Sequence, residues 1–314
     1  MDDIADFEEF IEHTKRSRDQ IGLRRYLRDN DNPFEKYTVE EFYSRYRFKQ
    51  ETVKNVLVPL VAPYLAKPTR RGMPFAPEVM VLGTLRYYAT GTCQNLGAGG
   101  DVVNICQQSM SRIVIVVSSL LASQLKNVIK FPPPAELPNV KKDFYDIASF
   151  PGLIGCLGCM HVRIKNPGGG MAEVFRNSDG WLSINVQAVT GPKLQFYDLV
   201  VRWPGSCHSS FIYNYSSLKQ RLQANQLQGI LLGDSGYELS PVVTTPYASP
   251  NSPAQERYNR SHSETRRTMD RAFAIWKKRF PCLQIGLSVK LETIVAVICA
   301  CATLQNLAIC TQRP

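Results

Sequence analysis

The chain has 314 residues, a length typical of about two domains, and its apolar and charged contents are those of an ordinary soluble globular protein. Its 37 lysines and arginines against 27 aspartates and glutamates give a net charge of +10, which favours a polyanionic partner such as nucleic acid. The nine cysteines are an odd number, and the N-terminus is acidic where a secretory signal peptide would be basic. We therefore expect an intracellular protein with reduced thiols and not a secreted disulfide framework.

Residues 1–131 predict a helical N-terminal region. Thr38 and Glu41 have the spacing of a capping box that begins a helix. Apolar residues then recur at helical spacing over residues 53–65, and a further helix is predicted over residues 77–90.

Residues 101–121 have a helix-turn-helix pattern, with a short helix, a break and a second helix that begins near residue 107. The second helix of such a motif offers polar residues at its start to the major groove of DNA. Here those residues are Gln108, Ser111 and Arg112. A helical core without a role in DNA binding fits the same pattern.

A proline-rich stretch over residues 132–145 predicts a linker, and the pattern changes to strands over residues 146–314. Ser252 followed by proline predicts the start of a long helix. The strands are predicted over residues 153–164, 182–189, 194–203 and 229–232, with a helix over 210–222 before the last of them. The chain is therefore expected to have an α/β fold in its C-terminal part.

The last segment, residues 291–310, is almost long and apolar enough to span a bilayer. Glu292, Gln305 and Asn306 interrupt it with polar groups. We expect a buried terminal helix and no membrane association.

Three motifs stand in a particular order: GCLGCMHVRI over residues 155–164, LLGDSGY over 231–237 and WKKRF over 276–280. Together they resemble the catalytic domain of Harbinger (PIF) transposases and of the nuclease derived from them. The resemblance covers about residues 30–310. It implies a ribonuclease H-like mixed-sheet domain of the DDE endonuclease type, preceded by a helix-turn-helix-like region.

The resemblance also implies a site in which three acids hold divalent metal ions, Mg²⁺ or Mn²⁺, that promote hydrolysis of DNA. The second acid corresponds to Asp234, and the third corresponds to Asp270, where the family commonly has Glu. The first corresponds to Gly158, which has no side chain and cannot hold a metal. As alternatives, Asp234 is an ordinary turn residue and Asp270 pairs with Arg266 one helical turn away.

Nothing near Gly158 in the sequence replaces the missing oxygen ligand. Cys156 shares its face of the strand, and Cys159 is a soft ligand that suits zinc or copper better than Mg²⁺. Thr190 and Ser209 stand at two further positions where the family has acids. Asp198 lies on the third strand and is not expected to reach the site.

Two functions follow from these residues. One is a nuclease-family homologue with impaired or lost catalysis that binds DNA or protein in the nucleus, and the alternative is an active metal-dependent DNA endonuclease. The last long helix is basic, so Arg266 and Lys277 are expected to contact phosphates, although a solvated helix face fits too. The resemblance implies a separate Myb/SANT-like DNA-binding partner and a nuclear or cytoplasmic location, and a homo-oligomer is left open.

Overall fold

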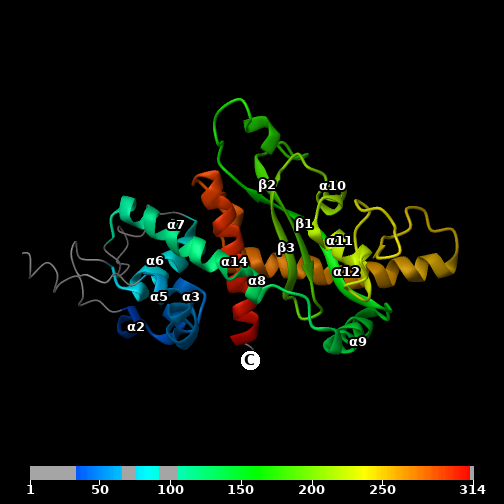
Figure 1. Ribbon diagram of the computed structural model, residues 1–314, viewed down its shortest axis with the longest axis horizontal. Helices are drawn as coiled ribbons and strands as arrows, with labels where there is room; N and C mark the ends of the chain where they lie inside the picture. Colours follow the sequence, from blue (N-terminus) through cyan, green and yellow to red (C-terminus); the bar gives the residue numbers. More distant parts are fainter. Residues whose placement is uncertain (1–32, 66–74, 92–104, 312–314) are drawn as a thin grey trace, which may run out of the picture.

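The computed structural model describes residues 33–65, 75–91 and 105–311, and it shows a mixed α/β protein built on a five-stranded sheet (Figure 1). The strands are β1 (Leu153–Arg163), β2 (Ser183–Thr190), β3 (Phe196–Pro204), β4 (Ile230–Leu232) and β5 (Val243–Thr244). Their order is β3-β2-β1-β4-β5, in which the first three strands are antiparallel and β4 and β5 run parallel to β1. The α/β prediction is confirmed, and only β5, two residues long, was missed.

The N-terminal part is helical, as predicted. Its elements are α2 (Pro33–Lys36), α3 (Val39–Tyr46), α4 (Gln50–Thr52), the π-helical η1 (Val53–Leu57), α5 (Val58–Leu65), α6 (Pro77–Thr90), α7 (Gln107–Ser123) and α8 (Leu125–Val128). The capping box is confirmed, because the Thr38 hydroxyl accepts from the Glu41 amide at 3.2 Å and the Glu41 carboxylate accepts from the Thr38 amide at 3.1 Å. These two bonds satisfy amides that the first turn of α3 leaves without helical partners.

The helix-turn-helix prediction is not confirmed. Residues 101–104, which include the expected first helix, lie outside the described residues. The expected second helix is α7, where Gln108 and Arg112 are exposed and Ser111 is half-buried. The opposite side of α7 packs on α6 and α14 (Leu291–Thr311). The role of α7 in reading DNA therefore stays a prediction.

The proline-rich stretch that was predicted as a linker is largely helical. Residues 132–145 contain the 3-10 turn η3 (Pro134–Glu136) and most of α9 (Leu137–Ala148), which packs on β1 and on α12 (Pro253–Arg279). Proline is tolerated here because it stands in the first turn, where its missing N–H has no helical partner. The helical region and the sheet share one hydrophobic core, and the division into domains stays a prediction.

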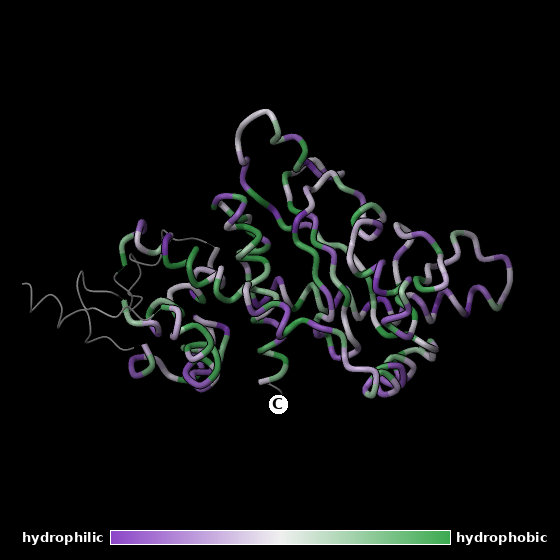
Figure 2. Tube along the Cα trace, in the orientation of Figure 1, coloured by the Kyte–Doolittle hydropathy of each residue, from purple (hydrophilic) through white to green (hydrophobic). Residues whose placement is uncertain are grey.

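The C-terminal helix α14 is buried, as predicted from its interrupting polar residues. It is the one helix of the described residues long and apolar enough to cross a bilayer, yet 67% of its most apolar window is buried in the protein. In Figure 1 it stands between the N-terminal helices and the sheet, and in Figure 2 it is mostly hydrophobic. Asn306 accepts from the amide of Phe196 and donates to its carbonyl, both at 2.8 Å, so this polar residue completes the edge of β3.

The helix α12 runs across the sheet in Figure 1 and carries one buried face. That face was predicted from its three- and four-residue spacing and includes His262, Thr265, Met269, Phe273 and Trp276. The remaining short elements are η4 (Ala172–Phe175), α10 (Ser209–Asn214), α11 (Ser217–Gln223) and α13 (Cys282–Ile285). The predicted helix over residues 210–222 is thus two helices. The packing of α12 on β1 and β2 brings its middle turns against Cys156 and Gly158 of β1 and against Thr190 at the end of β2.

Candidate functional site

The structure brings together the three positions that correspond to the acids of a DDE site. In the parallel pair of β1 and β4, Cys156 lies opposite Leu232. Gly158 follows two residues later on β1, and Asp234 follows two residues later in the turn after β4. α12 covers the same place, because a Cβ atom added at Gly158 would lie 3.2 Å from Cγ of Met269. Asp270 follows Met269 on that helix. The three positions therefore lie close together, although they are far apart in the sequence.

Asp234 is held in a defined turn after β4. Its Oδ1 accepts from the amide of Gly236 at 2.9 Å, and the carbonyl of the preceding Gly233 accepts from Nε2 of His262 at 2.9 Å. His262 is buried, which lowers its pKa, and the hydrogen bond to the Gly233 carbonyl partly opposes that shift. Because a carbonyl oxygen only accepts, Nε2 of His262 carries a proton in this contact. The turn that carries Asp234 is thus tied directly to α12.

Arg266 fills the space between the three positions. Its Nη2 donates to Oδ2 of Asp234 at 3.0 Å and its Nη1 donates to Oδ1 of Asp270 at 3.4 Å. The same Nη2 would lie 2.9 Å from a Cβ atom at Gly158. Only 15% of the Arg266 side chain is exposed. The pair with Asp270 was foreseen from the four-residue spacing, whereas the pair with Asp234 was missed because 32 residues separate the partners.

The residues at this place do not fit a two-metal site. Cys156 is buried and donates to the carbonyl of Thr265 at 3.6 Å, and burial raises its pKa to about 12. Its sulfur is in addition a soft ligand that suits Mg²⁺ poorly. Cys159 points to the Tyr237 hydroxyl at 3.3 Å, and burial raises its pKa. Among the residues that the structure describes, no three His, Cys, Asp or Glu side chains gather as metal ligands. A site for Mg²⁺ needs several oxygen ligands, and here two carboxylates face a guanidinium.

The two other substituted positions do not restore an acid. Thr190 is fully buried, and its hydroxyl donates to the sulfur of Met269 at 3.2 Å, so it packs α12 onto the sheet. Ser209, at the start of α10, lies beside Cys159. Its hydrogen bond to the Cys159 side chain partly offsets the rise in the Cys159 pKa that burial causes. Asp198 lies on β3 opposite Val189. Burial raises its pKa, and the positive charge of Arg221 opposes this shift. As expected, Asp198 does not fill the vacancy.

Asp198 makes a pH-dependent contribution to stability that a substitution can reveal. Burial raises its pKa from the ordinary 3.8 to about 6. Because the folded-state pKa is raised, the native state binds more protons than the unfolded state, and stability is lost as the pH rises from about 4 through 6. We expect Asp198→Asn to be more stable than the parent by about 2 kcal/mol at pH 7.5 and equal to it at pH 3.5. Urea unfolding at both pH values measures this.

The matched control is Asp179→Asn, which changes an exposed carboxylate. It should leave the stability difference between pH 3.5 and 7.5 unchanged. An Asp198→Asn variant that is less stable than the parent at pH 7.5 would mean that the carboxylate is held charged by Arg221 and not destabilised by burial.

Three further residues around the sheet, Gly205, Asn259 and Ser261, have structural roles. Asn259 donates to the carbonyl of Tyr247 at 2.9 Å and accepts from its amide at 2.9 Å, which fixes the loop after β5. Ser261 donates to the carbonyl of Ala148 at the end of α9. A Cβ atom at Gly205 would lie 2.5 Å from the carbonyl oxygen of Phe175, so only glycine fits there. Hydrogen bonds explain Asn259 and Ser261, and close packing explains Gly205.

The exposed cations of α12 lie on a face different from that of Arg266. Lys277 is half-buried, which lowers its pKa, and Arg266 has its two carboxylate partners. The exposed basic residues of α12 are Arg257, Arg260, Arg267, Arg271 and Lys278, which we name the basic stripe. They follow one another at steps of three, four and seven residues, so they form one line along the helix, opposite its buried face. No ion pair involving them is found among the described residues.

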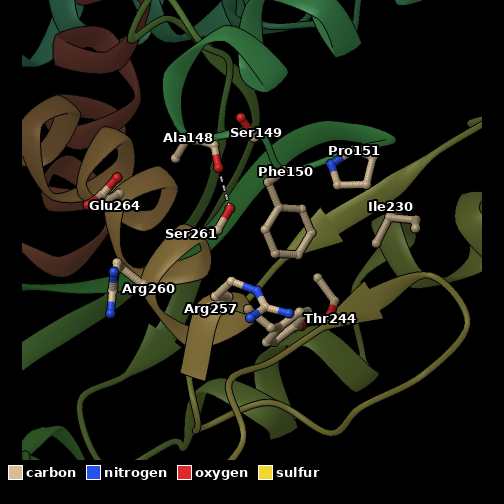
Figure 3. A pocket seen from close by; sticks show the side chains of 11 residues that line it. Ala148, Ser149, Phe150, Pro151, Ile230, Thr244, Arg257, Arg260, Ser261 and Glu264 are labelled. Atoms are coloured by element: carbon tan, nitrogen blue, oxygen red, sulfur yellow. Dashed lines mark hydrogen bonds between the residues drawn. The ribbon is translucent and has the colours of Figure 1, made fainter. Parts of the chain in front are cut away.

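A pocket of about 620 Å³ lies at the start of this stripe (Figure 3). Phe150 and Ile230 line its apolar part, and Arg257 and Arg260 of α12 stand at its side. None of Gly158, Asp234 and Asp270 lines it. The pocket is therefore separate from the acid positions, although the same helix borders both.

The chain is similar to known proteins over most of its length. Residues 157–306 match the family described as DDE superfamily endonuclease. "Putative nuclease HARBI1" of Bos taurus is 33% identical over 277 residues, which cover 87% of this chain and 78% of that relative, and the protein of the same name from Homo sapiens is 32% identical over the same shares. "Protein ALP1-like" of Arabidopsis thaliana is 22% identical over 289 residues, covering 85% of this chain and 70% of the relative. No solved structure matches the chain.

Proposed function

This chain belongs to the HARBI1 family of Harbinger-derived DDE superfamily endonucleases, and from that membership we propose that it is a nuclease homologue with lost or impaired catalysis that acts by binding DNA. Enzymes of this superfamily generally use divalent metals. The observation that carries the proposal is Gly158, which places no oxygen ligand where the first acid belongs, beside two retained carboxylates. Loss of a metal-bridging acid removes the charge that holds two cations near each other.

The fold that we assign to this domain is ribonuclease H-like. Its support is the strand order β3-β2-β1-β4-β5, with an antiparallel meander extended by two parallel strands and crossed by α12. In this arrangement the first acid position is on β1, the second follows β4 and the third is on α12. Gly158, Asp234 and Asp270 occupy those three places.

DNA is the partner that the charge distribution supports best. The basic stripe offers five exposed cations without carboxylate partners among the described residues, and its linear order suits a row of phosphates. We further propose a location in the nucleus or cytoplasm, a separate Myb/SANT-like partner protein that supplies sequence recognition, and helix α7 with Gln108, Ser111 and Arg112 as a second DNA contact. Whether the chain forms a homo-oligomer is decided by measuring its mass in solution.

The loss of catalysis is tested by incubating the purified chain with supercoiled plasmid and Mg²⁺ or Mn²⁺. We expect no nicking above the level of an Asp234→Ala variant prepared in parallel, because two carboxylates paired to an arginine cannot hold two metal ions. Nicking by the parent that disappears in Asp234→Ala would contradict the proposal, because a contaminating nuclease would be unaffected by the substitution.

The alternative function is an active metal-dependent DNA endonuclease. One observation favours it: Asp234 and Asp270 are retained and contact the same guanidinium, so the two carboxylates are near each other. The same plasmid assay decides between the two functions, and Asp270→Ala provides a second arm, since both acids would be needed in an active enzyme.

A further inference from the structure

The Arg266 guanidinium lies in space that the side chain of an acid at position 158 would need. A Cβ atom at Gly158 would lie 2.9 Å from Nη2 of Arg266, closer than ordinary van der Waals contact, and the rest of an aspartate side chain needs still more room. The guanidinium is the end of a flexible side chain and could move away, but doing so would break its contact with Asp234. The glycine is therefore what allows Arg266 to lie between the two carboxylates.

The guanidinium makes with these carboxylates the contacts that a bound cation would make. It contacts one oxygen of Asp234 at 3.0 Å and one of Asp270 at 3.4 Å, and 85% of its side chain is covered. Its Nε is buried and has no hydrogen-bond partner among the described residues. A buried donor without a partner is costly, so the position of this guanidinium is held by the two ion pairs and not by a full set of hydrogen bonds.

We propose that Arg266 is a resident cation that replaces the divalent metals of the site and keeps the two retained acids in a closed, metal-free arrangement. The inference rests on the proposed loss of metal-dependent catalysis and adds its structural cause. It means that the missing side chain at Gly158 and the place of the Arg266 guanidinium depend on each other. Arg266 is then a positioning residue that joins α12 to the turn after β4, and it is unavailable to DNA.

A direct consequence is that an acid at position 158 is insufficient to restore metal binding. In Gly158→Asp the new carboxylate would lie against the Arg266 guanidinium and pair with it. Only when the arginine is also removed, as in Gly158→Asp/Arg266→Ala, would three carboxylates face an empty space of the kind that Mn²⁺ binds.

The experiment measures Mn²⁺ binding to the full chain, without DNA, from the loss of the electron paramagnetic resonance signal of the free ion. The parent and Gly158→Asp should bind Mn²⁺ weakly and alike. Gly158→Asp/Arg266→Ala should bind it at least about 100-fold more tightly, because three oxygen ligands then meet without a competing cation. The matched control is Gly158→Asp/Arg267→Ala, which removes the exposed neighbouring arginine and should behave like Gly158→Asp.

A parent chain that binds Mn²⁺ as tightly as Gly158→Asp/Arg266→Ala would overturn the inference. So would Gly158→Asp alone reaching that affinity, since Arg266 would then not compete. These results are distinct from the plasmid assay. If the parent does not nick DNA and Gly158→Asp/Arg266→Ala binds Mn²⁺ no more tightly than Gly158→Asp, the resident cation is refuted and the proposed loss of catalysis stands.

A second measurement decides the matter if the doubly substituted chain does not fold. Asp234→Asn, Arg266→Gln and their combination form a double-mutant cycle in urea unfolding, with a chelator present. We expect the two substitutions to be coupled by at least about fivefold in the unfolding equilibrium constant, as for contacting residues of one ionic network. Additive effects would overturn the inference, because they would mean that the ion pair does not hold the site together.

Discussion

Reversing the charge of three residues in the middle of the basic stripe, in Arg260→Glu/Arg267→Glu/Arg271→Glu, is expected to weaken binding of duplex DNA by at least about 100-fold near 50 mM salt. The three arginines are exposed on one line of α12 and have no carboxylate partners among the described residues. Each lost phosphate contact should also lower the slope of log affinity against log salt by about 0.9, so the slope should fall by roughly 3. Fluorescence anisotropy with a labelled duplex across a salt series measures both quantities.

The control must change the net charge equally without touching α12. Lys49→Glu/Lys126→Glu/Lys142→Glu reverses three exposed lysines on the helices and loops outside the stripe. We expect this control variant to lower DNA affinity modestly, because it reduces the net positive charge of the whole protein. The slope of log affinity against log salt should stay nearly unchanged. If both triple variants behave alike, the stripe is not the DNA contact, and α7 becomes the surface to test.

Replacing Trp276 by alanine is expected to lower the free energy of unfolding by about 4 kcal/mol. Trp276 is fully buried, and its ring meets that of Phe196 edge-on with centroids 5.0 Å apart, which joins α12 to β3. A cavity at this junction would loosen the part of α12 that follows Arg266 and Asp270. Urea unfolding followed by circular dichroism measures the loss.

Two further variants make this expectation specific. Ile275→Ala, on the exposed side of the same turn, should cost less than about 1 kcal/mol. Trp276→Phe keeps an aromatic ring and removes an indole N–H that has no hydrogen-bond partner among the described residues, so it should recover a large share of the lost stability. Equal losses for Trp276→Ala and Ile275→Ala would show that α12 is not anchored at this junction.

Local patterns were reliable wherever neighbouring residues alone decide the structure. The capping box at Thr38, the helix over residues 77–90 and the buried face of α12 depend on hydrogen bonds or apolar spacing within a few residues, and all were predicted. The break between α10 and α11 and the helix inside the proline-rich stretch were not. Those segments are fixed by packing on the sheet and on α12, which no short window contains.

The amino-acid sequence by itself determined the family, the first four strands with the long helix α12, and the vacancy at Gly158, because each depends on residue types and their separations along the chain. Only the tertiary structure decided what occupies that vacancy. From the sequence, Arg266 was expected to pair with Asp270 or to contact phosphates of DNA. In the fold, its guanidinium lies between Asp234 and Asp270, beside Gly158. The pairing of β1 with β4 and the packing of α12 across them bring these distant residues within 3–4 Å, where the charges of the carboxylates decide the arginine's place.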